Sequence, residues 1–249
     1  MTGVAELVGD LEAEQRALQA VLADLDADAW LAPTPAWGWD VRDTVAHLAD
    51  VDDMAIDTAT GGPYAINDLS ARAASGPDVT YHGVLRGRRL TGAEVAAWWI
   101  ASSAAVRSML LTIPVDARVP WGIGMRTPSL VTARLMETWA HGLDVHAALG
   151  LEPVDTDRLA HVAWLATRAL PYAYSVAGRA APADPIRVEL TLPSGAAWTY
   201  GPDHATDRIS GTAGDYCRVF VHRLPAADSN LVVVGDAARS AIAVARAFL

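Results

Sequence analysis

The chain has 249 residues, of which 52% are hydrophobic, so it can bury the core of one large domain or of two modest ones. Its net charge of −10 argues against a nucleic-acid or anionic-membrane partner, because both partners require a basic patch. All 19 basic residues are arginine, which excludes a Schiff-base lysine, a pyridoxal phosphate enzyme and a Walker-type phosphate loop.

Three features bear on the compartment. The single cysteine, Cys217, cannot form an intramolecular disulfide, which favours a reducing environment. The N-terminus is acidic and lacks the basic-then-apolar order of a signal peptide. The longest apolar run, near residues 95–106, is too short to span a bilayer. We therefore expect a cytoplasmic protein.

The first 150 residues show the apolar spacing of long amphipathic helices. Asp40 is a plausible N-cap, Thr91 and Glu94 form a capping box, and Thr127 and Pro128 are expected as N-cap and first helical residue. The expected helices cover residues 4–25, 41–58, 91–113 and 127–150. Four long helices are typical of a four-helix bundle.

The connection over residues 61–90 contains glycines and has no sustained period. It is unusually long for a bundle, where a few residues join antiparallel neighbours. Such a length suits a crossover to a non-adjacent helix, a lid over a pocket, or both.

The pattern changes in the last third of the chain. A fifth helix is expected over about 157–174, and residues 186–192 then alternate with period two and could pair with 197–200 as a hairpin. Further strands are expected at 208–211 and 231–234, and helices at 215–224 and 236–248. We therefore expect a metal-binding helical bundle over residues 1–178 and a small α+β domain over 179–249.

Two residues of the fourth helix, Glu137 and His141, are four positions apart and so share one helix face. They could be part of a metal site or a buried ion pair. His47 is expected to face inward from the second helix. Two histidines and one carboxylate with open positions resemble a catalytic zinc site, but the same donors also suit nickel, iron or manganese.

These residues lie in segments that resemble a known family. The segments are Trp39-Asp40-Val41-Arg42-Asp43, then Val45-Ala46-His47-Leu48, and Glu137-Thr138-Trp139-Ala140-His141-Gly142-Leu143-Asp144-Val145. Together they resemble the DinB-like superfamily, and within it the branch of mycothiol-dependent maleylpyruvate isomerases. The resemblance extends over most of the chain. It implies a metal-binding four-helix bundle followed by a small α+β domain.

The resemblance also implies an activity. His47, Glu137 and His141 would be the metal ligands, zinc the usual metal, and a small thiol such as mycothiol the cosubstrate. An arginine of the C-terminal domain would grip a substrate carboxylate. No motif identifies that arginine, so Arg223 is our catalytic candidate, with Arg208 and Arg218 as alternatives.

Several other side chains could belong to the site. Asp144 could orient a ligand histidine or pair with an arginine. His82 could be a fourth ligand, a general base or a solvated loop residue, and Trp121 is the tryptophan we favour as a pocket wall. Cys217 is expected to be buried and unreactive. His146 is expected to be structural, and no ligand-like spacing is found for His161, His204 and His222.

Three functions remain open at this point. The first is a metal-dependent isomerase or S-transferase that uses a thiol and acts on a small molecule. The second is a Lewis-acid hydrolase or cyclase without a thiol. The third is a non-catalytic binding protein with an apolar cleft. A homodimer is compatible with all three.

Overall fold

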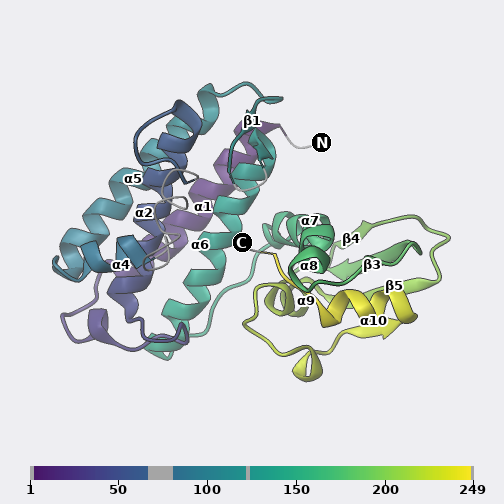
Figure 1. The fold of residues 1–249 in the computed structure, drawn as a ribbon. Helices are drawn as coiled ribbons and strands as arrows, with labels where there is room; N and C mark the ends of the chain where they lie inside the picture. The colour runs from purple at the N-terminus through teal and green to yellow at the C-terminus, as the bar shows by residue number, and fades with distance from the viewer. Residues whose placement is uncertain (1–2, 67–80, 122–123, 248–249) are drawn as a thin grey trace. The chain divides into compact units, whose positions relative to one another are not determined.

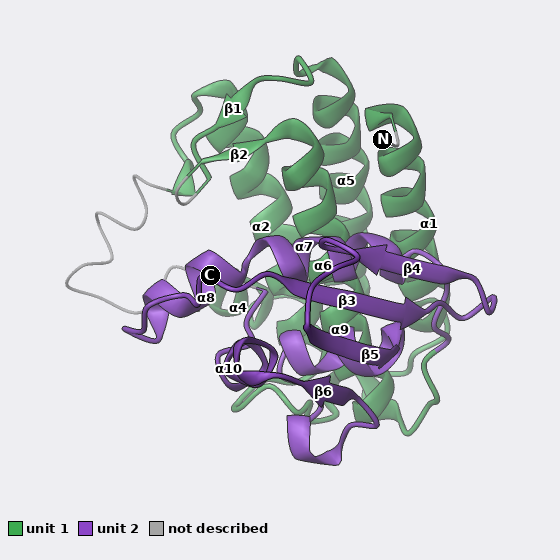
Figure 2. Cartoon of the chain, turned by 90° about the vertical axis from the view of Figure 1, so that its right-hand side faces the viewer, with its two compact units in different colours: residues 1–153 green, residues 154–249 purple. Residues whose placement is uncertain are grey.

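A computed structural model describes residues 3–66, 81–121 and 124–247 of the chain. The chain divides into two compact units, Met1–Pro153 and Val154–Leu249, which Figure 2 shows in different colours. The expected architecture, a four-helix bundle followed by a small α+β part, is confirmed. The division lies earlier than residue 178, because the next two helices, α7 (Leu159–Arg168) and α8 (Leu170–Val176), belong to the second unit.

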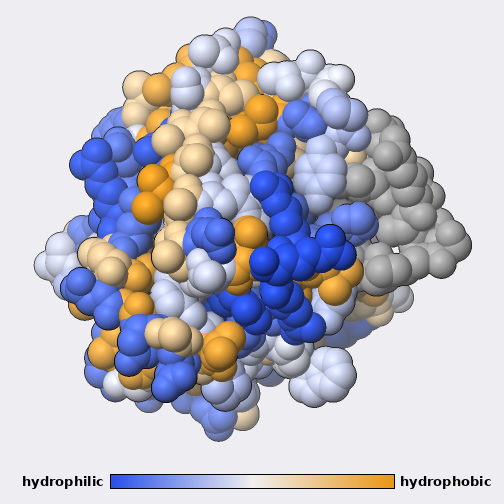
Figure 3. All heavy atoms as spheres, turned by 90° about the vertical axis from the view of Figure 1, so that its left-hand side faces the viewer, coloured by the Kyte–Doolittle hydropathy of each residue, from blue (hydrophilic) through white to orange (hydrophobic). Residues whose placement is uncertain are grey.

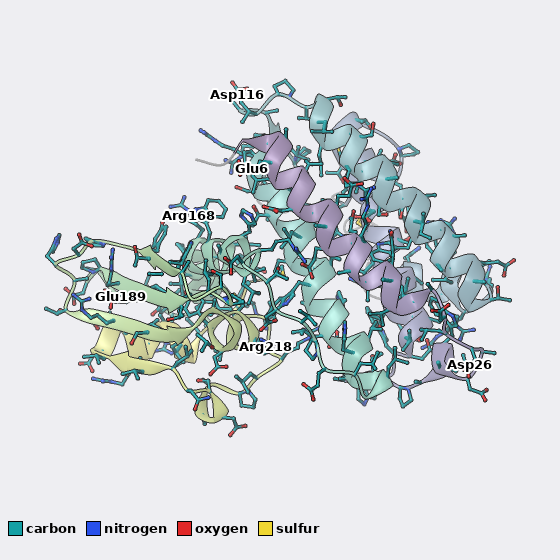
Figure 4. The ribbon with its side chains drawn as sticks, turned by 180° about the vertical axis from the view of Figure 1, so that it is seen from behind. Glu6, Asp26, Asp116, Arg168, Glu189 and Arg218 are labelled. Atoms are coloured by element: carbon teal, nitrogen blue, oxygen red, sulfur yellow. The ribbon has the colours of Figure 1, made fainter. Side chains whose placement is uncertain are left out.

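Unit 1 is built from four long helices (Figure 1). They are α1 (Val4–Leu22), α2 (Val41–Thr60), α5 (Gly92–Thr112) and α6 (Thr127–Leu149). Helix α2 packs against α5 and α6, and α1 packs against the same two helices. In Figure 4, α1 runs from near Glu6 toward Asp26, which lies just beyond its end. The packing brings α2 and α6, which are distant in sequence, into direct contact.

Capping residues define where these helices begin. Asp40 accepts a hydrogen bond from the backbone N–H of Asp43, and Thr91 accepts one from Glu94, each within a complete capping box. Helix α6 differs from expectation, because its N-cap is Arg126 and Thr127 is already its first helical residue. The Thr127 hydroxyl instead donates to the carbonyl of Pro114 at 2.8 Å.

The connection between α2 and α5 contains a short helix, α4 (Tyr81–Gly87), which the sequence pattern did not predict. Residues 67–80 of the same connection lie outside the described residues. Helix α4 approaches α2 closely at Gly83, which has no side chain. A Cβ added there would lie only 2.4 Å from the Cβ of Asp50. A role of this connection as a lid stays a prediction.

The described part of unit 1 also contains a 3-10 helix and a short pair of strands. A 3-10 helix, η1 (Ala29–Leu31), contributes the buried Trp30 to the core. Strands β1 (Arg118–Val119) and β2 (Met125–Arg126) form a short antiparallel pair just before α6.

The apolar run near residues 95–106 lies in α5, and the expectation that it is too short to span a bilayer needs correction. The whole helix is long and apolar enough, by length and composition alone, to cross a membrane. Here it is a helix of the bundle, with Trp99, Val106 and Leu110 fully buried. Its other face exposes Ile100 and Leu111. Figure 3, which views the molecule from the left-hand side of Figure 1, shows exposed apolar residues between strongly hydrophilic ones. The apolar composition of α5 is therefore accounted for in part by the bundle core.

Unit 2 combines a mixed sheet with short helices. The strands are β3 (Ile186–Thr191), β4 (Ala197–Tyr200), β5 (Asp207–Thr212) and β6 (Val232–Val234), in the order β4-β3-β5-β6. Strand β3 pairs antiparallel with β4, as the hairpin prediction required, and parallel with β5. The helices are α7 (Leu159–Arg168), α8 (Leu170–Val176), α9 (Ala213–Phe220) and α10 (Asp236–Ala243), with a 3-10 helix η2 (Ala226–Asp228).

Three helix predictions in unit 2 need correction. The helix expected over 215–224 is α9, which begins at Ala213 and ends at Phe220, so Arg223 lies beyond its end. The expected helix over 157–174 is divided into α7 and α8, since Pro171 lies in the first turn of α8, where its missing N–H is tolerated. Helix α7 packs against α9 and β4, which places it in the second unit. The last helix ends at Ala243 rather than at residue 248.

Candidate metal centre

Three potential metal ligands converge from the two helices α2 and α6. His47 projects from the second turn of α2, and Glu137 and His141 lie one turn apart on α6. Both histidines are buried, with 6% and 9% of their surface exposed, and Glu137 is partly exposed. One ligand atom from each residue lies within 4.8 Å of the other two. The structure thus brings together the three residues that the sequence pointed to.

The distances suit a common ion. Nε2 of His141 lies 3.4 Å from Oε2 of Glu137, and Nε2 of His47 lies 3.9 Å from the same oxygen. Two donors on one tetrahedral zinc ion, bound at 2.0–2.1 Å, are about 3.3 Å apart. The described donors therefore fit a small divalent cation after a minor adjustment. Two imidazoles and one carboxylate also leave coordination positions open, as in catalytic sites.

Asp144 holds one of the two histidines. Its Oδ2 lies 3.0 Å from Nδ1 of His141, one turn along the same helix, and the carboxylate is 1% exposed. With a proton on Nδ1, the ring donates to Asp144 and keeps the Nε2 lone pair available on the side of Glu137. This is the orienting role considered for Asp144 from sequence. The other histidine differs, because Nδ1 of His47 is buried and has no partner in the described part of the chain.

Burial and charge set the protonation of the three residues. Burial lowers the pKa of His47, which favours the neutral ring that a metal needs. Burial would raise the pKa of Glu137, but the neighbouring imidazoles of His141 and His47 and the positive charge of Arg134 outweigh it and lower that pKa well below its ordinary value. Burial likewise opposes the charged form of His141, yet Asp144 and Glu137 raise its pKa. These shifts favour opposite charges on Glu137 and His141, which agrees with the ion pair that was the alternative interpretation.

The indole of Trp39 lies against both imidazoles. Its ring centroid is 5.0 Å from that of His47 and 6.0 Å from that of His141, and its plane is nearly parallel to His141. The loop that carries Trp39 is held by its own hydrogen bonds, since the carbonyl of Trp39 accepts from the backbone N–H of Thr34 at 2.9 Å. Arg88 adds a bond to the adjacent carbonyl of Gly38. Trp39 is therefore a wall of the candidate site, a role that we had favoured for Trp121.

The remaining candidates lie elsewhere. His82 is exposed on α4 and is not part of the three-residue cluster. Trp121 is buried in the segment between β1 and β2, and its role as a pocket wall stays a prediction. His146 bonds the carbonyl of Gly142 on its own helix, which agrees with a structural role. Cys217 is fully buried, and its thiol lies 3.6 Å from the carbonyl of Leu159.

The three candidate arginines belong to unit 2. Arg208 pairs with Glu189 at 2.7 Å, and Arg218 makes a two-point pair with Asp155 at 2.6 and 3.0 Å. Figure 4 labels Glu189 and Arg218. Arg223 donates to the carbonyl of Val221 at 2.7 Å. A catalytic role for Arg223 stays a prediction.

Sequence reasoning missed one feature beside the site. Arg134 and Asp52 form a buried ion pair between α6 and α2. The available signal was an arginine three residues before Glu137, within a run of mostly apolar residues. Its partner could not be inferred from spacing, because it lies on another helix.

The helical bundle matches a known family of domains. The model of the mycothiol maleylpyruvate isomerase N-terminal domain matches residues 11–146, which include all three potential ligands. Two uncharacterised proteins from two strains of Mycobacterium tuberculosis are 36% identical over 242 residues, covering 97% of this chain and 94% of theirs.

Similar folds are known from crystal structures. Mycothiol-dependent maleylpyruvate isomerase and a variant of it superpose with a TM-score of 0.57 at 15% identity, covering 87% of this chain and 88% of that chain. At this identity the likeness concerns the fold. The domain match and the relatives, together with the fold, show that this chain belongs to the mycothiol maleylpyruvate isomerase family of DinB-like proteins.

Proposed function

We propose that this protein is a metal-dependent enzyme that isomerises a small electrophilic or anionic molecule or transfers a thiol to it, with mycothiol or a related small thiol as cosubstrate. The observation that carries the proposal is the convergence of His47, Glu137 and His141 within 4.8 Å, from two helices of a family whose name refers to mycothiol and maleylpyruvate. A cytoplasmic location and a homodimer belong to the same proposal.

The residues around the cluster have separate tasks in this proposal. His47, Glu137 and His141 would hold the ion, and Asp144 would keep His141 in the tautomer that presents Nε2. Trp39 would shield one side of the site from water. A bound zinc ion would supply Lewis acidity, which stabilises a thiolate at neutral pH or polarises a substrate carbonyl.

The burial of the protein's own thiol, that of Cys217, favours an external thiol as the cosubstrate. Cys217 is the single cysteine of the chain, and its side chain is fully buried in unit 2. Burial also raises the pKa of its thiol well above the ordinary value, so it is a poor nucleophile. A reaction that needs a thiolate would therefore require a small thiol from solution.

The proposal is tested by cobalt substitution of the full chain. We expect about one equivalent of cobalt in the wild-type protein, and loss of most of it in His47→Ala, Glu137→Gln and His141→Ala. Addition of mycothiol should change the visible spectrum of the cobalt protein, whereas the same compound with a blocked sulfur should not. Turnover of maleylpyruvate in the presence of mycothiol is the first activity to measure.

The outcomes separate the alternatives. A wild-type protein that takes up no cobalt, zinc, nickel, iron or manganese would refute the metal centre and favour a non-catalytic binding protein. Cobalt uptake that depends on the three residues, with a spectrum insensitive to mycothiol, would instead favour a thiol-independent hydrolase or cyclase.

A further inference from the structure

A second polar pair joins the two helices that carry the candidate metal ligands. Nε of Arg134 on α6 donates to Oδ1 of Asp52 on α2 at 2.9 Å. Both side chains are 1% exposed, and Arg134 is among the largest fully buried side chains. Arg134 precedes Glu137 by one turn, and Asp52 follows His47 on α2. Each ligand-bearing helix thus contributes one partner to this pair.

Stability alone explains the pair poorly. Removing two charges from water costs several kcal/mol per ion, and well-packed apolar residues often replace such a pair without loss of stability. The pair is also incompletely satisfied, because Oδ2 of Asp52 is buried and has no hydrogen-bond partner in the described part of the chain. The burial of this pair costs free energy, and its hydrogen bonding is incomplete. We therefore expect a role other than the stability of the bundle.

We propose that Asp52 and Arg134 are positioning residues that set the register of α2 against α6, and thereby the distance of His47 from Glu137 and His141. An N–H···O bond is directional, so it fixes the position of one helix along the other more strictly than apolar contacts do.

The scale of the effect follows from helix geometry. A slip of one residue moves a helix by about 1.5 Å along its axis. Metal–ligand distances tolerate only about 0.2 Å. A small change in register would therefore separate the histidine on α2 from the two ligands on α6 while leaving the fold intact. The inference rests on the proposed metal centre and adds the residues that keep it assembled.

The test replaces both charges by apolar side chains of similar size in the full chain, as Asp52→Leu with Arg134→Met. We expect a folded protein whose melting temperature is equal or higher, but whose cobalt affinity is about 10–100-fold weaker, as for other supporting residues of metal sites. Its cobalt absorption spectrum should also change.

Thr132→Val is the matched control. It too removes a buried polar group from α6, but that hydroxyl donates to the carbonyl of Pro128 on the same helix, at 2.9 Å, rather than to a residue of α2. We expect this variant to keep the cobalt affinity and spectrum of the wild type.

A folded double variant with wild-type cobalt affinity and spectrum would overturn the inference. Should the double variant fail to fold, Arg134→Lys decides the question, since it keeps the charge but lacks the fixed donor geometry of a guanidinium. It should bind cobalt more weakly with an altered spectrum, and wild-type behaviour would again overturn the inference. A wild-type protein that binds no cobalt would contradict the metal centre itself, which is a distinguishable result.

Discussion

Asp144 lies 3.0 Å from Nδ1 of His141 and so determines which nitrogen of that ring faces Glu137. No described residue does the same for His47, whose buried Nδ1 lacks a hydrogen-bond partner. The two histidines of the candidate site are thus held differently. One is held by a carboxylate on its own helix, and the other mainly by the packing of α2 and by the indole of Trp39.

The first prediction concerns Asp144. Asp144→Asn keeps the size of the side chain but removes its charge, so His141 becomes a weaker and less well oriented ligand. We expect the affinity for zinc or cobalt to fall about 10–100-fold, measured by competition with a chromophoric chelator. The control is Asp207→Asn, which removes a buried carboxylate that bonds the backbone N–H of Ala237 in unit 2. Equal affinities of Asp144→Asn and the wild type would contradict the orienting role.

The second prediction concerns Trp39. A bound cobalt ion should quench the fluorescence of this indole, because its ring lies 5.0 and 6.0 Å from the rings of the two histidine ligands. Trp39→Phe should therefore remove a large part of the cobalt-dependent quenching. Trp37→Phe is the control, since Trp37 is in the same loop but is 98% exposed. If Trp37→Phe abolished the quenching and Trp39→Phe left it unchanged, the ion would have to bind elsewhere.

Much of the bundle could be predicted because its signals are local. The spacing of apolar residues, the N-cap at Asp40 and the capping box at Thr91 mark helices wherever they pack. The unit boundary could not be predicted in the same way. It depends on whether α7 packs with the bundle or with the sheet, and that choice is made by tertiary contacts. The break between α7 and α8 did have a local signal, Pro171.

The candidate site, too, could be predicted only where the signal is local. Glu137 and His141 share a helix face by spacing alone, and His47 could be added because it faces inward on another helix. The pair Asp52–Arg134 required knowledge of how α2 packs on α6, which no spacing contains. Trp39 belongs to a segment that carries the family resemblance, but its position over the histidines depends on the hydrogen bonds of its loop.

The third prediction concerns the start of α2. Asp40→Ala removes the side chain that accepts from the backbone N–H of Asp43 at 2.7 Å. We expect a loss of about 1 kcal/mol in the free energy of unfolding, within a range of about 0.5–2 kcal/mol, measured by urea denaturation. Thr91→Ala, the equivalent change at the start of α5, should destabilise by a similar amount. A change below about 0.3 kcal/mol in both variants would show that tertiary packing alone defines these helix ends.

The fourth prediction concerns the thiol of Cys217. Burial raises the pKa of this group well above its ordinary value, with a smaller contribution from the negative charge of Asp155. At pH 7.5 the folded protein should therefore react with an aromatic disulfide far more slowly than free cysteine does, and should react with about one equivalent once it is unfolded in urea. Rapid labelling of the native protein at this pH would contradict the buried position of the thiol.

The raised pKa of Cys217 also predicts how the stability of the fold changes with pH. A thiol whose folded pKa is raised stays protonated in the folded state, while the thiol of the unfolded chain ionises near pH 8.5. The stability contribution is thus fully present below about pH 8.5 and is lost as pH rises above it, by at most about 1.4 kcal/mol per pH unit. The decrease in the urea midpoint between pH 7.5 and 9.5 should be larger for the wild type than for Cys217→Ala, which cannot ionise. Parallel decreases in the two proteins would assign the alkaline instability to other groups.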